Sequence, residues 1–138
     1  MRILQLHCDN ISYEPTKKEI QSAEEIDPKL VSIDEVVVSF IAVEKDDTED
    51  VAKDAISQIQ ESMKKIGCQK LLLYPYAHLS SDLASPSTAL SLLKFMESNS
   101  EGLEVSRAPF GWTKSYNVKV KGHPLAESSK VITSGDKK

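Results

Sequence analysis

The chain contains 138 residues, of which 40% are hydrophobic and 28% are charged, and its formal net charge is −4 at neutral pH. This length suits one domain with a core of its own. The acidic balance argues against a domain that holds a nucleic-acid backbone by itself, because such binding depends on Lys and Arg. No apolar run approaches the ~18 residues that a membrane span needs, and the first residues lack the pattern of a secretory signal peptide. We therefore expect a cytoplasmic protein that does not contact a membrane.

The first third of the chain predicts three strands. Residues 2–8 indicate an opening strand, and residues 11–14 indicate a second one after a short turn at Asp9-Asn10. The polar stretch 15–33 is typical of a surface loop. Residues 34–44 are rich in β-branched residues and apolar on both faces, which predicts a central, buried strand.

Two helices are predicted in the middle of the chain. Acidic residues at 46–50 suit the start of a helix, and apolar residues then recur at helical spacing up to Gly67, which ends it. Residues 70–74 predict a buried strand. Ser85 and Pro86 are suited to the N-cap and first position of a second helix, which fades near residues 98–100.

The remaining segments predict two strands, at 103–108 and 116–121, and a polar stretch from Glu127 onward. The predicted order is β-β-β-α-β-α-β-β, which indicates a mixed α/β fold with two main helices, parallel neighbours in the β-α-β portions and antiparallel terminal hairpins. We expect one domain over residues 1–133, with residues 134–138 forming a polar tail or the start of a linker.

The usual nucleotide, metal and serine-hydrolase motifs are absent from the sequence, so no metal or cofactor is expected. His78 follows a buried strand, at the kind of sheet edge where ligands bind in α/β folds, and a histidine can transfer protons near neutral pH. Lys114 follows the aromatic residues Phe110 and Trp112 and has the chemistry to bind a phosphate or polarise a water. A Ser–His nucleophile built from Ser80 is disfavoured, because no third group is evident to orient the histidine.

Each of these residues also has an ordinary structural interpretation. His78 can simply bond a loop carbonyl, and Lys114 can be a solvated lysine at a sheet edge. Glu127 suits a substrate ammonium but equally suits solvent. Trp112 is able to stack on a base or pack in the core, and His123 fits a turn between Gly and Pro.

Taken together, the motifs resemble the N-terminal editing domain of archaeal-type threonyl-tRNA synthetases. The resemblance lies in Tyr-Pro-Tyr-Ala-His-Leu-Ser-Ser at 74–81, Ala-Pro-Phe-Gly-Trp-Thr-Lys at 108–114 and Lys-Gly-His-Pro-Leu-Ala-Glu at 121–127. The opening residues 1–9 and the strand 38–44 also match, so the resemblance spans nearly the whole chain.

The resemblance implies a fold similar to D-aminoacyl-tRNA deacylases, a homodimer, and hydrolysis of L-seryl-tRNA(Thr) that spares L-threonyl-tRNA(Thr). It places the catalytic residues at Lys114 and His78. It also implies a set of substrate-binding residues, which are Val43, Pro75, Tyr76, Ala77, Phe110, Thr113 and Glu127. Some members have Tyr where this chain has Thr113, which leaves open any role for a phenol there.

The implied chemistry is physically reasonable. A synthetic site that accepts threonine rejects serine only weakly, because one methyl group is worth about 1–3 kcal/mol, and a second hydrolytic site corrects the error. The ester hydrolysis needs a positioned water, which the tRNA 2′-OH can help to hold. The expected partners are the 3′ end of tRNA(Thr) carrying L-serine and the remainder of the synthetase, in one chain or in a split system.

Three alternatives remain open from the sequence. The first is a D-aminoacyl-tRNA deacylase, which removes D-residues whatever the side chain. The second is a non-catalytic module that docks tRNA or dimerises a synthetase. The third is a generic α/β domain with an unrelated ligand.

Overall fold

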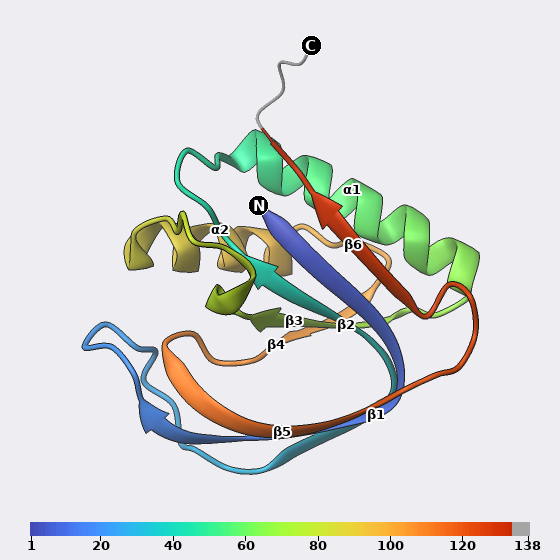
Figure 1. The fold of residues 1–138 in the computed structure, drawn as a ribbon, viewed down its shortest axis with the longest axis horizontal. Coiled ribbons are helices and arrows are strands. Elements are labelled where there is room, and N and C mark those ends of the chain that lie inside the picture. The colour runs from blue at the N-terminus through green and yellow to red at the C-terminus, as the bar shows by residue number, and fades with distance from the viewer. Residues whose placement is uncertain (134–138) are drawn as a thin grey trace.

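The structure, a computed structural model, describes residues 1–133, and the predicted tail at 134–138 lies outside the described residues. In the described part, six strands form one curled sheet, and two α-helices pack on one face of it (Figure 1). The elements in chain order are β1 (Arg2–Lys18), β2 (Val31–Ala42), α1 (Glu49–Ile66), β3 (Lys70–Pro75), the short 3₁₀-helix η1 (Ala77–Leu79), α2 (Pro86–Ser98), β4 (Glu104–Arg107), β5 (Trp112–Val120) and β6 (Glu127–Val131).

The sheet is mixed, as the sequence predicted. Its strand order is β4-β3-β2-β1-β5, and β6 also pairs with β1. The pairs β2–β3 and β3–β4 are parallel, whereas β1 runs antiparallel to β2, β5 and β6. The helical connections therefore fall between parallel strands, which is what a β-α-β unit requires.

The prediction of two short strands at the start of the chain, joined by a turn at Asp9-Asn10, is wrong. β1 is one long strand, paired with β2 from Arg2 opposite Ala42 to Tyr13 opposite Val31. Its pairing with β5 shifts between Cys8 and Asn10, which marks a bulge instead of a turn. A bulge adds a residue and bends the strand without reversing it. The bend lets the first part of β1 pair with β6 and the second part with β5 (Figure 1).

The sequence also did not predict the strand that lies in the polar stretch from Glu127 onward. β6 pairs antiparallel with the first residues of β1, from Arg2 opposite Val131 to Leu6 opposite Glu127. Short, polar strands are typical of sheet edges, where they discourage further pairing. The end of β6 is fixed by Ile132, which is buried and whose backbone oxygen accepts from the amino group of Met1 at 2.8 Å.

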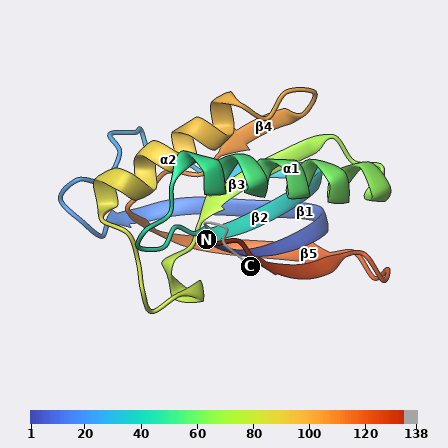
Figure 2. The ribbon, with the colours of Figure 1, turned by 90° about the horizontal axis from the view of Figure 1, so that it is seen from above.

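Both helices begin and end as predicted. The Thr48 side chain accepts from the backbone N–H of Val51 at the start of α1, and Gly67 ends it with a left-handed φ of 81°. Ser85 caps α2, and Pro86 occupies its first turn. The two helices run side by side over the sheet (Figure 2), and their apolar faces bury a core against β2 and β3.

A second core lies inside the curl of the sheet. It includes Tyr13, Phe40 and Tyr74, with Val118 and Val120 of β5 packed against it. The sheet is therefore covered on one face by helices and on the other by its own curled edge. This buries residues 36–42 of β2 and 71–74 of β3 on both faces and explains the apolar runs there.

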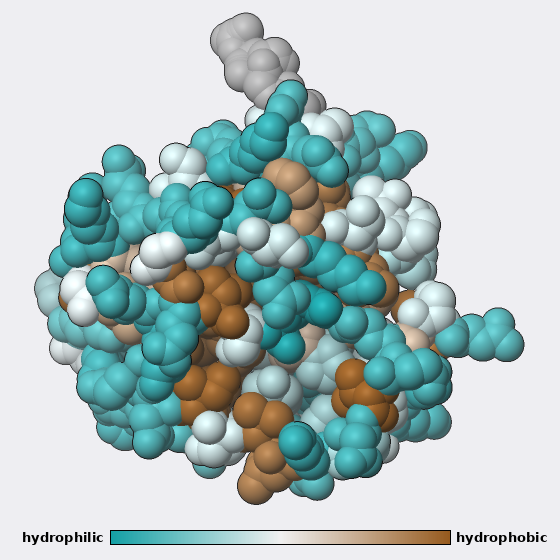
Figure 3. All heavy atoms as spheres, turned by 180° about the vertical axis from the view of Figure 1, so that it is seen from behind, coloured by the Kyte–Doolittle hydropathy of each residue, from teal (hydrophilic) through white to brown (hydrophobic). Residues whose placement is uncertain are grey.

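Two surface features complete the fold. On the face opposite to that of Figure 1, apolar side chains form several small patches separated by polar ones (Figure 3), so this face has no broad apolar area. Among the described residues, neither helix is long and apolar enough to cross a membrane.

Candidate active site

Three segments meet at one edge of the sheet. Parallel pairing places the ends of β2 and β3 side by side, with Ile41 opposite Pro75 and the Tyr76 N–H donating to the Ile41 oxygen at 2.8 Å. The curl of the sheet brings the start of β5, which pairs with the far end of β1, beside these strand ends. Ligands commonly bind beyond the carboxyl ends of such strands.

Two adjoining cavities open where these segments meet. We call the first, of about 300 Å³, the apolar cavity, because its walls include Val43, Ala84, Ala89, Leu93 and Phe110. We call the second, of about 250 Å³, the tyrosine cavity, and its walls include His78, Thr113 and three tyrosines. The residues that line both cavities are Glu19, Pro75, Tyr76, Ala77, Trp112 and Lys114.

Lys114 lies at the junction of the two cavities. Its Nζ donates to the backbone oxygens of Pro109 at 3.1 Å and Trp112 at 3.0 Å, and it lies 5.0 Å from the centre of the Tyr74 ring. Burial disfavours the charged amine and lowers the pKa of Lys114 to about 8, although Glu19 and Glu24 oppose the change. At pH 8 about half of the amine is therefore neutral. A lysine with this titration is able to act as a cation or as a base near physiological pH.

The turn before Lys114 depends on a glycine. Gly111 adopts a φ of +84°, and a Cβ built there would lie 2.8 Å from the Cα of Ala23. The Gly111 oxygen accepts from the Glu19 N–H at 2.8 Å. The segment between β1 and β2 therefore packs directly on this turn, although the sequence indicated only a surface loop there.

Aromatic rings and His78 line the tyrosine cavity. His78 lies in η1, is exposed, and stacks edge-on against Tyr76 with 5.4 Å between ring centres. The Tyr116 hydroxyl donates to the Tyr76 hydroxyl at 3.5 Å. This contact and partial burial raise the pKa of Tyr116 to about 12, so the Tyr116 phenol stays a neutral hydrogen-bonding group at physiological pH.

The structure brings together most of the residues that the resemblance implied. Lys114, Val43, Pro75, Tyr76, Ala77 and Phe110 line the apolar cavity, and His78 and Thr113 line the tyrosine cavity beside Lys114. Glu127 is the exception. It starts β6 opposite Leu6, whereas Lys114 pairs with Pro15 toward the other end of β1, so Glu127 lines neither cavity.

Sequence reasoning missed Glu19 and Tyr116. Among the residues that the structure describes, Glu19 is the one acidic side chain lining either cavity. Both residues lie outside the sequence motifs at 74–81 and 108–114, and only the folded structure brings them next to those motifs. Local sequence carries no signal that the loop after β1 folds back over the start of β5.

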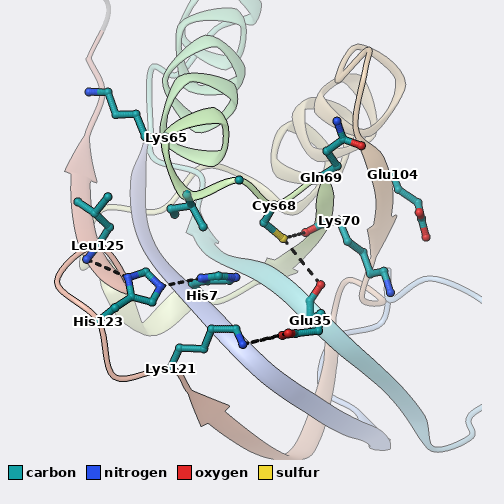
Figure 4. Close-up of a pocket in the computed structure, with 12 residues that line it drawn as sticks. His7, Glu35, Lys65, Cys68, Gln69, Lys70, Glu104, Lys121, His123 and Leu125 are labelled. Carbon is teal, nitrogen blue, oxygen red and sulfur yellow. Dashed lines mark hydrogen bonds and ion pairs between the residues drawn. The ribbon is translucent and has the colours of Figure 1, made fainter.

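A larger cavity of about 710 Å³ lies at the opposite end of β3, near Lys70 (Figure 4). Two histidines face each other there, with 2.8 Å between His7 Nδ1 and His123 Nε2. The His123 Nδ1 accepts from the Leu125 N–H at 3.2 Å. With Nδ1 accepting, Nε2 of His123 is the nitrogen that donates to His7. His123 thus orders its own turn, in agreement with its structural interpretation.

One lysine of this larger cavity, Lys121, is held between two carboxylates. Lys121 Nζ lies 2.6 Å from both an Asp9 oxygen and a Glu35 oxygen. The C-terminal end of α1, at Gly67, adds the partial negative charge of a helix terminus. Lys121 is therefore already occupied by carboxylates, whereas Lys114 lies beside the carboxyl ends of β2 and β3 and marks the better candidate site.

Comparisons with known proteins identify the family of the chain. The profile of the archaea-specific editing domain of threonyl-tRNA synthetase matches residues 1–132. The chain belongs to this family. As an editing domain of a threonyl-tRNA synthetase, it is of the aminoacyl-tRNA hydrolase class.

Two relatives show the extent of the match. The threonine–tRNA ligase of Nitrosopumilus maritimus is 70% identical over 134 residues, which cover 96% of this chain and 22% of that protein. That of Cenarchaeum symbiosum is 58% identical, with the same two coverages. The editing domain described here therefore spans about a fifth of the length of these curated relatives.

Solved structures support the fold alone. A c-Myc DNA unwinding element binding protein aligns with a TM-score of 0.66 at 10% identity, covering 97% of this chain and 100% of that one. A probable eukaryotic D-amino acid tRNA deacylase aligns with a TM-score of 0.57 at 14% identity, covering 94% and 97%. The expected deacylase-like fold is thereby confirmed.

Proposed function

We propose that this editing domain hydrolyses L-seryl-tRNA(Thr) and spares L-threonyl-tRNA(Thr) at the Lys114 site. The observation that carries the proposal is the Lys114 amine at the junction of two cavities, because one cavity suits an aminoacyl group and the other a terminal nucleoside. The tRNA body would be held by the rest of the synthetase, since the net charge of −4 gives this domain little attraction for phosphates.

The reaction is the addition of water to the ester carbonyl. The carbon–oxygen bond to the ribose 3′-oxygen then breaks, the proton passes to that oxygen, and free serine leaves. Lys114, as an ammonium, polarises the water or stabilises the developing oxyanion. His78 orients the ribose or relays the proton, and the tRNA 2′-OH holds the water. Alignment of this kind contributes several kcal/mol without a covalent intermediate.

We expect the site to distinguish seryl from threonyl substrates by where the attacking water can bind, and not by steric exclusion of the threonine side chain. The two substrates differ by one methyl, and the apolar cavity, at about 300 Å³, has room for either side chain. A water molecule occupies roughly 30 Å³ of liquid, close to the space that a methyl group fills. The threonine methyl would then act by displacing the attacking water.

A single-turnover assay of this chain tests the function. It compares L-seryl-tRNA(Thr), L-threonyl-tRNA(Thr) and a D-aminoacyl-tRNA with a buffer-only control. Release of L-serine with L-threonine spared supports the proposal. Release of the D-residue alone would instead identify a chiral deacylase, and binding of charged and uncharged tRNA without release would identify a docking module.

The rate enhancement is expected to fall as the pH rises through about 8. Burial lowers the pKa of Lys114 from its usual 10.5 to about 8, so the ammonium is present below that pH and is lost above it. The measurement is the single-turnover rate divided by the spontaneous hydrolysis rate at each pH between about 6.5 and 9. A ratio that rises over this range would contradict the cationic role and identify the neutral amine as a base.

The expected homodimer and the expected role of Glu127 are linked. Within one chain Glu127 lines neither cavity, so it reaches a bound α-ammonium only from a second copy. We expect Glu127→Gln to slow deacylation about ten-fold, and wild-type activity to fall on dilution as sedimentation shows the dimer dissociating. If Glu127→Gln is fully active and Glu19→Gln is not, Glu19 pairs with the ammonium and the chain acts alone.

A further inference from the structure

Glu24 joins the loop after β1 to the turn that precedes β5. One carboxylate oxygen accepts from the Phe110 N–H at 2.8 Å, and the other accepts from Arg107 Nη2 at 3.0 Å. The backbone of Glu24 contacts the same turn. Its N–H donates to the Phe110 oxygen at 3.0 Å, and its oxygen accepts from Trp112 Nε1 at 2.8 Å. Glu24 therefore holds the turn on both sides of Gly111.

The same turn supplies both hydrogen-bond acceptors of Lys114. Nζ of Lys114 donates to the oxygens of Pro109, which precedes the residues that Glu24 contacts, and of Trp112, which is one of them. A shift of the turn would move these two oxygens and change the burial of the amine. The location of the Lys114 amine in the site thus depends on contacts made by a residue far from it in sequence.

Glu24 and Arg107 are mostly buried, with side chains 17% and 11% exposed. Burial alone would raise the pKa of Glu24, but hydrogen bonds from Arg107 and the Phe110 N–H outweigh it and the pKa is lowered, so the carboxylate is ionised. Arg107 Nε also donates to Glu97 of α2 at 2.9 Å. A buried, ionised pair with several partners has a defined geometry, which suits a positioning role.

We propose that Glu24 is a positioning residue that sets the location of the Lys114 amine by holding the Pro109–Trp112 turn. The proposal rests on the proposed function in that Lys114 is taken as the catalytic lysine. Glu24 itself lines neither cavity and is not expected to touch the substrate.

Two substitutions separate position from charge. Glu24→Asp keeps the charge but shortens the side chain, so one carboxylate no longer reaches both Arg107 and the Phe110 N–H. Glu24→Gln keeps the reach and an acceptor oxygen but removes the charge. The matched controls are Glu25→Asp and Glu25→Gln, because the neighbouring Glu25 is 84% exposed and pairs only with Lys18 among the described residues.

Two readouts are measured for each folded variant, with melting temperatures recorded alongside. The first is the single-turnover rate on L-seryl-tRNA(Thr). The second is the titration of Lys114 by NMR of its side chain, which requires no substrate. We expect Glu24→Asp to slow the rate about ten-fold and to raise the pKa of Lys114 from about 8 toward 10.5, because the loosened turn admits water.

Glu24→Gln is expected to stay within about three-fold of the wild-type rate. It should not raise the pKa of Lys114, because losing a nearby carboxylate disfavours the ammonium. The reverse order, with Gln impaired and Asp normal, would overturn the proposal by showing that Glu24 acts through charge. A Glu24→Asp variant that matches Glu25→Asp in both readouts would overturn it as well. If the wild-type chain releases no serine, the proposed function fails, and the Lys114 titration still decides the role of Glu24.

Discussion

Lys114→Met is expected to lower the single-turnover rate on L-seryl-tRNA(Thr) by at least ~10-fold, which is about 1.4 kcal/mol of barrier. The amine lies at the junction of the two cavities, and Met fills similar space without a charge or a donor. The melting temperature should not fall appreciably. Burial already disfavours the Lys114 ammonium, and its removal offsets the loss of two hydrogen bonds to backbone oxygens.

Lys130→Met is the matched control for this experiment. Lys130 is half-buried on β6, and burial lowers its pKa too, but it lines neither cavity. Its replacement removes a comparable side chain without affecting the site. Equal rates for Lys114→Met and the wild type would remove Lys114 from the mechanism. Equal losses in both lysine variants would point to a general effect of charge.

Gly111→Ala is expected to lower the free energy of unfolding by about 3 kcal/mol and to reduce deacylation strongly. A residue other than glycine at a φ of +84° costs about 1–2 kcal/mol. The added Cβ would also lie 2.8 Å from the Cα of Ala23, and relieving such overpacking typically costs a further 1–3 kcal/mol. The relief must separate the loop from the turn that holds Lys114, so stability and activity should fall together.

Gly102→Ala isolates the contribution of backbone strain. Gly102 has nearly the same φ, +83°, but a Cβ there meets nothing within 4 Å. We expect a loss of about 1–2 kcal/mol and unchanged activity. Chemical denaturation of both variants provides the comparison. If the two substitutions destabilise the chain equally, the close packing of Ala23 on the turn contributes nothing measurable.

Much of the fold followed from local sequence. The start and end of α1 were predictable because a cap at Thr48 and a glycine at 67 act on the nearest turns of the same helix. The apolar runs of β2 and β3 predicted burial on both faces, and residues 36–42 and 71–74 of these strands are buried. The resemblance then selected Lys114 and His78, and the structure places both at the edge where those strands end.

The bulge in β1, the pairing of β6 and the approach of Glu19 and Glu24 were not predictable in this way. Each depends on a partner far along the chain: β6 pairs with the opening residues, and Glu24 reaches Phe110. A polar stretch has the same local pattern whether it remains a loop or pairs as an edge strand.

The helices, the buried strands and the residue types at the site followed from local sequence, because periodicity, caps and apolar runs act over a few neighbouring residues. Which side chains share a cavity depends instead on how the whole chain folds. The tertiary structure placed Glu127 outside and Glu19 inside, and it buried the amine of Lys114 enough to lower its pKa to about 8. These properties arise from desolvation and from contacts between distant segments, which no local pattern encodes.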